Sequence, residues 1–432
     1  MKFIAARVEF LVSILFLWIA TGIFWPPASY FNKTALALDA SDPTSTAAHI
    51  VFIALLIVVA IVRRDDMLWA LRCGWPLLPL LALAYLSAFW SDAPTLVLRR
   101  STTLAITTVF AMYLTVRYEL PRLISILLKL SVVGVVGSFT VMVVAPDLAL
   151  GGSIDYPNAI RGAYTAKNTL GGISSFGIII AVYALWRGYG SRLIAGALIP
   201  ANLALLLVSQ SATALLLVVA ATYVATLASA LRRRSGAGLV LGFAMIVLGL
   251  AGIGLLALGW DEVLAALNRN PTLTGRAQIW RMALADIGHR PWFGYGYGAF
   301  WRQSTVEARN MWTIVFWIVP HAHNAWLEAG LALGIVGMIG ITWLWLTAFY
   351  RSLRLLTEPS AQHVVFCMAL FIAILIENLT EYEFFRADSF FWVLFVVAFT
   401  DLGSAALGVR RIEARSPLAL GATPGLAPAM SD

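Results

Sequence analysis

Long apolar runs, separated by short polar or charged connections, dominate the chain. Each run is close to the roughly 20 residues that a helix needs to cross a bilayer, and each is bounded by charged residues, proline or glycine. The pattern predicts an all-α, polytopic integral membrane protein with about twelve transmembrane helices in a domain over 1–410. The runs that we interpret as spans are 8–25, 47–62, 74–90, 102–116, 123–145, 168–186, 193–209, 212–230, 238–258, 324–349, 362–378 and 388–409.

Lysine and arginine residues follow the alternation of these runs. If the N-terminus is cytoplasmic, every connection on that side carries at least two basic residues, from Lys2 and Arg7 to Arg410 and Arg411. The short outer connections are nearly free of them. Because cytoplasmic loops of membrane proteins are enriched in lysine and arginine, we expect both termini in the cytoplasm and an even number of spans.

Composition supports the membrane class. Hydrophobic residues make up 60% of the 432 residues and charged residues only 12%, about half the share in a soluble domain. The net charge of +8 follows largely from the cytoplasmic connections, so it implies no nucleic-acid partner. Cys73 and Cys367 lie in or beside predicted spans, which indicates neither a disulfide framework nor a cysteine metal site.

The two ends of the sequence need separate interpretation. Lys2 and Arg7 precede an apolar stretch, as in a cleavable signal peptide. The end of this stretch, Phe24-Trp25-Pro26-Pro27, lacks a small-x-small cleavage site, so an uncleaved first span is favoured. Residues 411–432 are rich in alanine, proline and glycine and are expected to form a disordered cytoplasmic tail.

Two outer segments, 146–167 and 259–323, are unusually long and rich in arginine. Long loops cross the membrane largely regardless of their charge, so 259–323 is expected to be a large periplasmic loop. Within it, 274–288 reads as a short amphipathic helix that Thr274 caps and Gly288 ends. Its apolar face consists of Ile279, Ala283 and Ile287, at helical spacing.

Aromatic residues and glycines alternate after this helix, over 291–301. Such a density of aromatic side chains suits either the membrane–water interface or stacking on sugar rings, and the interface is favoured. A phosphate-binding loop is not indicated, because no strand precedes the glycines and no Gly-Lys-Ser/Thr follows them.

The loop ends at His321 and His323, just before an apolar run. On a helix, residues two apart point about 200° away from each other, which is poor geometry for joint chelation. We therefore expect no metal and no cofactor. A structural histidine at a helix N-terminus is one alternative. A general base is the other, because histidine changes its charge near neutral pH.

Five motifs within 90–350 resemble, in order and spacing, the core of the O-antigen ligase and O-antigen polymerase superfamily. They are Arg161-Gly162-x-Tyr164-x-x-Lys167-Asn168-x-x-Gly171, Ser209-Gln210-Ser211-x-Thr213, Thr274-Gly275-Arg276-x-x-Ile279-Trp280, Pro291-x-x-Gly294-x-Gly296-x-Gly298-x-Phe300 and His321-x-His323-Asn324-x-x-Leu327. The resemblance implies a C-type glycosyltransferase architecture in the bacterial inner membrane. It also implies a polyprenyl-diphosphate-linked saccharide donor and metal-independent transfer on the periplasmic face.

The resemblance also singles out residues. The family's arginine-x10-glycine, histidine-x10-glycine and arginine-x3-leucine patterns are matched by Arg161 with Gly172, His323 with Gly334, and Arg276. The second pattern selects His323 over His321. In the third, Trp280 stands at the leucine position, which puts only the packing around Arg276 in doubt.

The chemistry of such a transfer suits these residue types. A lipid diphosphate leaves as an anion, and soluble glycosyltransferases often neutralise it with a divalent ion held by carboxylates. The outer loops contain no Asp-x-Asp, whereas arginine offers a permanently charged, bidentate fork. We therefore expect Arg161 and Arg276 to clamp the diphosphate. His323 would accept the proton of the attacking acceptor hydroxyl, in a single displacement that inverts the anomeric carbon.

Further residues are candidates for substrate contacts. Arg99 and Arg100 follow an outer connection and could reach the diphosphate, although snorkelling to the interface is the favoured alternative. For the others, helix capping or an interfacial role competes with a phosphate, sugar or histidine-orienting contact. They are Lys167, Asn168, His321, Asn324 and Glu328.

Three functions are compatible with the pattern. A polymerase passes the glycan to a lipid-linked repeat unit, with a chain-length regulator as a further partner, and a ligase passes it to the lipid A core. Both need the same clamp and base, and an exopolysaccharide or O-antigen polymerase is favoured. A transporter or flippase would place ionisable residues near mid-bilayer or show repeated halves. The spans here are nearly free of charge, and no half is duplicated.

Overall fold

The architecture is described from a computed structural model. It describes residues 2–24, 43–151, 156–258, 275–359, 361–387 and 389–407. Over these ranges the chain folds into helices, and an isolated antiparallel bridge joins Leu150 to Ile160. The predicted all-α class is confirmed for this part of the chain. The predicted tail over 411–432 lies outside the described residues.

Within the described residues, every predicted apolar run coincides with helical structure. The α-helices are α1 (Lys2–Thr21), α3 (Pro43–Val62), α4 (Arg64–Cys73), α5 (Leu78–Leu86), α6 (Pro94–Arg117), α7 (Leu120–Val144), α8 (Pro146–Ala149), α9 (Lys167–Arg187), α10 (Arg192–Val208), α11 (Ala212–Arg232), α12 (Gly236–Leu258), α14 (Arg276–His289), α15 (Val306–Val315), α16 (Ala325–Leu355), α17 (Val364–Thr380) and α18 (Phe390–Ala406). Short 3-10 turns, η1 (Trp75–Leu77) and η2 (Ser87–Phe89), flank α5.

Several helices have the length and apolar character of membrane spans. Among the described residues, α7, α9, α11 and α16 meet both requirements, and α4 together with the η1–α5–η2 segment makes a fifth span if this pair, bent by 71°, counts as one. Other apolar helices, such as α17 and α18, are shorter. The chain is thus a helical membrane protein, and a count of about twelve spans stays a prediction.

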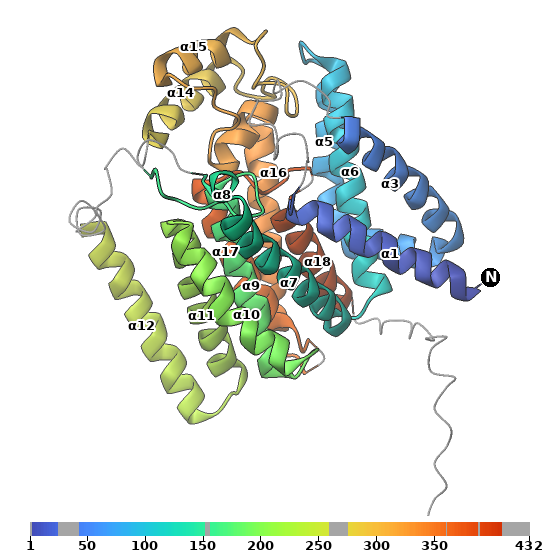
Figure 1. The fold of residues 1–432 in the computed structure, drawn as a ribbon, viewed down its shortest axis with the longest axis vertical. Coiled ribbons are helices and arrows are strands. Elements are labelled where there is room, and N and C mark those ends of the chain that lie inside the picture. The colour runs from blue at the N-terminus through green and yellow to red at the C-terminus, as the bar shows by residue number, and fades with distance from the viewer. Residues whose placement is uncertain are drawn as a thin grey trace, which may run out of the picture.

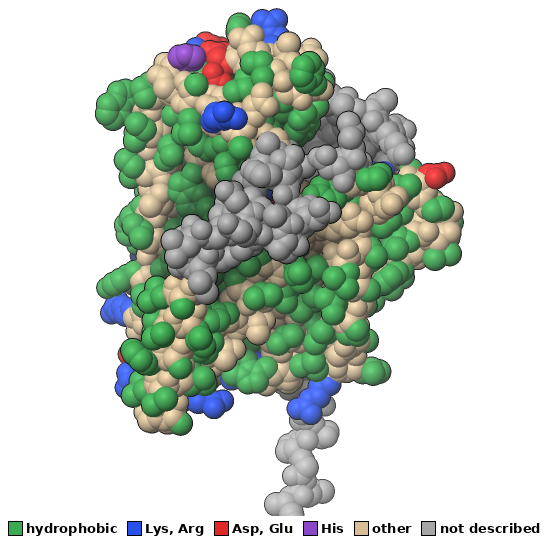
Figure 2. All heavy atoms as spheres, turned by 90° about the vertical axis from the view of Figure 1, so that its left-hand side faces the viewer, with side chains coloured by type: hydrophobic (Ala, Val, Ile, Leu, Met, Phe, Trp, Pro, Cys, Tyr) green, Lys and Arg blue, Asp and Glu red, His purple; other side chains and the backbone are tan. Residues whose placement is uncertain are grey.

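The helices form a bundle with a small helical cap at one end. In Figure 1, α14 and α15 lie together above the bundle, and α12 lies at its lower left edge beside α11. Hydrophobic side chains cover most of the height of the surface in Figure 2, and Lys and Arg side chains gather towards its lower end. Such a distribution suits a bundle whose sides face lipid.

The centre of the bundle is packed with aromatic side chains from α16 to α18. Trp392 is fully buried, and its ring stacks on Phe395 at a centroid distance of 5.7 Å. Phe384, from the connection between α17 and α18, packs edge-on against both rings and stacks on Trp345 of α16. This cluster anchors the connection that begins at Glu381.

Helix α16 is broken at Gly334, where φ is 65° and ψ is −160°. The backbone of the preceding loop occupies the break. The N–H of Ile335 donates to the carbonyl of Pro291 at 2.7 Å, and the N–H groups of Tyr295 and Gly296 donate to Leu331 and Ala332 at 2.9 Å each. The loop therefore satisfies backbone groups that the break leaves without helical partners.

The aromatic segment 291–301 is mostly interior, so the interfacial belt favoured from the sequence is wrong for most of it. Tyr295 and Tyr297 are each 4% exposed, and Phe300 and Trp301 are also buried. Only the start of the segment, with Trp292 at 65% exposure, has the accessibility of a belt. The segment is interior because its backbone pairs with α16.

The amphipathic helix predicted over 274–288 is present as α14. Ile279, Ala283 and Ile287 are all buried, as expected. The helix begins after Gly275, whose φ is 84°, and continues one residue beyond Gly288. The predicted cap Thr274 lies outside the described residues.

Candidate active site

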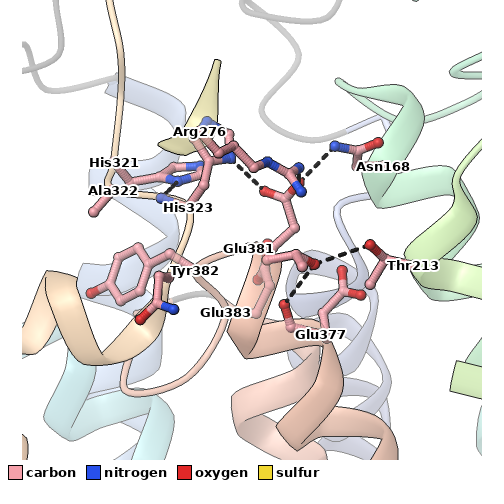
Figure 3. Close-up of polar contacts among 12 residues, drawn as sticks. Asn168, Thr213, Arg276, His321, Ala322, His323, Glu377, Glu381, Tyr382 and Glu383 are labelled. Atoms are coloured by element: carbon pink, nitrogen blue, oxygen red, sulfur yellow. Dashed lines mark hydrogen bonds and ion pairs between the residues drawn. The ribbon is translucent and has the colours of Figure 1, made fainter. Parts of the chain in front are cut away.

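Four segments meet at the end of the bundle below α14. They are the start of α9, the start of α14, the connection 320–324 that leads into α16, and residues 381–387, which follow α17. Figure 3 shows their polar side chains directed towards one another, with Glu381 at the centre. The side chain of Glu381 is only 11% exposed, so its charge needs partners.

Glu381 has three such partners. Its Oε2 lies 2.9 Å from Nδ1 of His323. Its Oε1 accepts a hydrogen bond from Nδ2 of Asn168 at 2.6 Å and another from the guanidinium of Arg276. Glu381 therefore brings together three residues that the sequence identifies as candidates, His323, Asn168 and Arg276. Glu381 itself is not among those candidates.

These contacts set the charge of the cluster. Burial opposes ionisation of Glu381, but the hydrogen bond and charge of His323 and the charge of Arg276 outweigh it and lower the pKa of Glu381 to about 2. When the imidazole of His323 is neutral, the ionised carboxylate accepts a hydrogen bond from its Nδ1–H. Nε2 of His323 then carries the lone pair, as a general base requires.

The two histidines lie side by side. Their ring centroids are 4.2 Å apart, and Nδ1 of His321 accepts the backbone N–H of His323 at 3.3 Å. The expectation that the rings diverge is wrong, because both residues precede the helix and His323 has a left-handed φ of 51°. Burial, followed by the charge of His323, lowers the pKa of His321 well below its usual value, so this ring is neutral.

A metal ion has to be considered at this position. His321, His323 and Glu381 each offer one ligand atom, and these atoms lie within 4.8 Å of one another. Catalytic zinc sites use three protein ligands of this kind. Here, however, Arg276 and Asn168 already donate to the same carboxylate, and a cation would have to compete with them. The expected independence from metal stays a prediction.

Glu328 and Asn324 hold the connection 320–324, the histidine segment, in place. The carboxylate of Glu328, 5% exposed, accepts from the indole N–H of Trp301 and from the backbone N–H of Ala322, each at 2.9 Å. Oδ1 of Asn324 caps α16 by accepting from the N–H groups of Trp326 and Leu327. Asn324 is thus a helix cap, as one of the two alternatives predicted. Glu328 anchors the backbone between the two histidines.

Arg161 and Lys167 flank the start of α9. The guanidinium of Arg161, which is 7% exposed, donates to the carbonyls of Leu148 at 2.8 Å and Thr165 at 3.4 Å. The ammonium of Lys167 lies 4.0 Å from the ring centroid of Tyr156. These contacts brace the connection that leads to Asn168, and a direct role of either cation towards the substrate stays a prediction.

Arg99 and Arg100 lie on the first turns of α6. Arg100 donates to the carbonyl of Gly298, so it supports the loop that packs on α16. Arg99 is exposed. Contact of these side chains with a diphosphate stays a prediction.

The sequence analysis does not identify the connection after α17 as part of the site. Glu377, Glu381, Glu383 and Arg386 fall within ten residues that begin at the end of one apolar run and stop before the next. Ionisable residues within membrane helices are costly and mark functional sites, so Glu377, inside the predicted run 362–378, was a usable signal for this cluster. Asn378 shapes the connection, since its Oδ1 accepts from the N–H groups of Glu383 at 2.8 Å and Phe384 at 2.7 Å.

The fold and the site together define a helical membrane protein with a partly buried histidine–carboxylate–arginine cluster at one end of its bundle. Residues 195–342 match the family model described as O-antigen ligase. This match confirms the resemblance seen in the motifs. It includes Arg276, His321 and His323 but neither Asn168 nor Glu381.

A curated relative supports the same superfamily. The chain is 33% identical over 223 residues to the exopolysaccharide production protein ExoQ of Rhizobium meliloti (strain 1021), a match that covers 48% of this chain and 49% of the relative. The chain thus spans about half the length of that relative. Family and relative together support a membrane glycosyltransferase of the ligase or polymerase type.

Proposed function

We propose that this chain is a polysaccharide polymerase of the bacterial inner membrane. It transfers a glycan from a polyprenyl-diphosphate carrier to a sugar hydroxyl of a lipid-linked acceptor, on the periplasmic face. The observation that carries the proposal is the 2.9 Å contact between His323 and Glu381, with Arg276 on the other carboxylate oxygen. In this proposal the imidazole is the base and the guanidinium is the cation that faces the leaving group.

His323 acts as the general base. The acceptor O–H gives its proton to Nε2 of His323 as the oxygen attacks the anomeric carbon of the donor. Glu381 holds the ring through Nδ1 and stabilises the imidazolium that forms. The bond between the anomeric carbon and the diphosphate breaks, its electron pair leaves with the diphosphate, and the configuration inverts.

Arg276 stabilises the leaving group. One nitrogen of its guanidinium contacts Glu381, and the fork offers further N–H groups to diphosphate oxygens. The Glu381 contact fixes the orientation of the fork before the substrate binds, which is how preorganised charge lowers a barrier. Arg161 is the second arginine of the proposed clamp.

A ligase is the second candidate, because the matching family model is described as O-antigen ligase, whereas the relative is named for exopolysaccharide production. The two differ in the acceptor, which for a ligase is the lipid A core. A strain that lacks this gene distinguishes them. A polymerase defect leaves single repeat units on the lipid carrier, and a ligase defect leaves long glycans on it.

The catalytic assignment is tested by His323→Ala and His321→Ala. Loss of a general base lowers the rate by about 10²–10⁴-fold, so His323→Ala should abolish polymer formation, whereas His321→Ala should be milder. The measurement is product chain length on gels from the deletion strain complemented with each variant at matched expression. Near-normal product from His323→Ala, or a null from His321→Ala alone, contradicts the assignment.

The same assay with purified enzyme tests the arginine clamp. Because arginine neutralises the diphosphate in the proposed mechanism, turnover of the lipid-diphosphate donor should persist in excess EDTA. A strict requirement for Mg²⁺, Mn²⁺ or Zn²⁺ would overturn the clamp and favour the His321–His323–Glu381 triad as a metal site.

A further inference from the structure

Three large apolar side chains are exposed directly before the histidine segment. Phe316, Trp317 and Ile318 are 92%, 47% and 53% exposed. Phe316 has a left-handed φ of 60° at the end of α15, a conformation that non-glycine residues adopt rarely. This turn directs the chain from α15 back towards the site.

The segment is firmly attached on the side of His323. The indole N–H of Trp312 donates to the carbonyl of Val319 at 2.9 Å, and that of Trp280 donates to Ala322 at 3.0 Å. Val319 and Ala322 are fully buried. The exposed side chains are therefore held in a defined position relative to the histidines.

Trp317 differs from its two neighbours because it also contacts the site. Its ring centroid lies 6.1 Å from that of His323, with the planes inclined by 51°. About half of the indole thus remains open while the ring borders the proposed base. Phe316 has no ring contact with the histidines among the described residues.

The indole N–H of Trp317 is available as well. Four tryptophans near the cap donate theirs to protein acceptors: Trp280 to Ala322, Trp301 to Glu328, Trp312 to Val319 and Trp326 to Thr342. Within the described part of the chain, the indole N–H of Trp317 has no such acceptor. An open aromatic face with a free donor at its edge suits a ligand that is apolar on its face and polar at its rim.

We propose that Trp317 is the platform of an acceptor subsite, on which the sugar ring that presents its hydroxyl to His323 stacks. The proposal rests on the proposed function and identifies the ligand as a neutral pyranose. A pyranose has C–H bonds on its faces and hydroxyls around its edge, which match the indole face and the N–H. A lipid surface would use Phe316 and Ile318 equally and would need no contact with His323.

Binding of the free saccharide tests the platform without turnover. The probe is the radiolabelled repeat-unit saccharide, released by mild acid from the lipid carrier of the deletion strain and used without its diphosphate. Equilibrium dialysis against the purified full-length chain should show binding weakened about tenfold by Trp317→Ala and Trp317→Leu. Trp317→Tyr should bind within about threefold of wild type, because a ring that can stack is retained.

Trp292→Ala is the matched control, since Trp292 is 65% exposed but lies outside the histidine cluster, and it should bind like wild type. Equal thermal unfolding temperatures exclude a folding defect in the Trp317 variants. If Trp317→Leu binds like wild type, or if the wild type does not bind the saccharide, the platform is refuted. Saccharide binding that depends on Trp317, without any transfer by the wild type, would refute the proposed function and leave the platform standing.

Discussion

Glu381 connects side chains from three distant parts of the chain. His323 lies 58 positions before it and Asn168 lies 213 positions before it. A single carboxylate that binds a base on one oxygen and a cation on the other orients both at once. Glu381 is therefore a positioning residue on which both halves of the proposed chemistry depend.

Glu381→Gln tests this dependence. Glutamine has nearly the same shape but carries no charge, so it neither fixes the imidazole tautomer nor stabilises the imidazolium. The comparable change in a histidine–carboxylate pair of serine proteases lowers kcat by about 10⁴-fold, and we expect a loss of at least about 10²-fold here. The measurement is the initial rate of transfer by purified enzyme. Glu383→Gln is the control, because Glu383 pairs with Arg386, and equal effects of the two variants would contradict the positioning role.

The carboxyl group of Asp286 should make the stability of the folded protein depend on pH. Burial, followed by the negative charge of Glu307, raises its pKa to about 6. The folded protein thus binds this proton more tightly than the unfolded chain does, so the contribution of Asp286 to stability declines as pH rises from about 4 to 6.

Asp286→Asn should remove this contribution. We expect a gain on the order of 1 kcal/mol in the free energy of unfolding at pH 7.5 and little change below pH 4. Thermal unfolding in detergent over pH 4–8 measures the effect. A variant that is less stable than wild type at pH 7.5 would show that the charge of Asp286 is needed in the folded state.

At the scale of elements, the helices were predictable and their irregularities were not. An apolar run of about 20 residues in a bilayer has to satisfy its backbone internally, so it has to be a helix. The break in α16 gave no such signal, because Gly334 stands in an apolar run that continues on both sides. Its cause is the loop 291–296, which reaches it only in the folded protein.

The candidate site, too, was predictable only in part. His323 and Arg276 were found through motif spacing, and both are in the cluster. The close approach of the two histidine rings was missed because it depends on the turn at His323. Glu381 was missed because its partners are distant in sequence, although the glutamates beside it were visible.

Gly334→Ala should be severe. A Cβ at this position would lie 2.3 Å from the carbonyl carbon of Trp292, and the φ and ψ of Gly334 are nearly exclusive to glycine. We expect a loss of at least about 2 kcal/mol of stability, seen as a lower unfolding temperature and loss of transfer. Gly196→Ala in α10 is the control, since its Cβ would meet nothing within 4 Å. A wild-type unfolding temperature in Gly334→Ala would mean that the break is dispensable.

At the scale of the whole molecule, the site lies at one end of the bundle, and the α11–α12 connection lies at the other (Figure 1). The predicted orientation places the site in the periplasm. Ser304 and Ser235 are exposed near opposite ends, and the native cysteines at 73 and 367 are buried, so single cysteines introduced at the two serines can be labelled selectively. In intact cells, a membrane-impermeant maleimide should label Ser304→Cys and not Ser235→Cys. The reverse pattern would invert the topology.

The backbone hydrogen bonds between the loop 291–296 and α16 also affect how the protein folds during synthesis. During synthesis, Tyr295 and Gly296 leave the ribosome before Leu331 and Ala332, the residues whose carbonyls their N–H groups finally meet. Until α16 follows, those N–H groups have only water as a partner. Closure of the loop therefore waits for the synthesis of α16. His323 directly precedes α16 and Glu381 directly follows α17, so their contact forms only after both helices have been made.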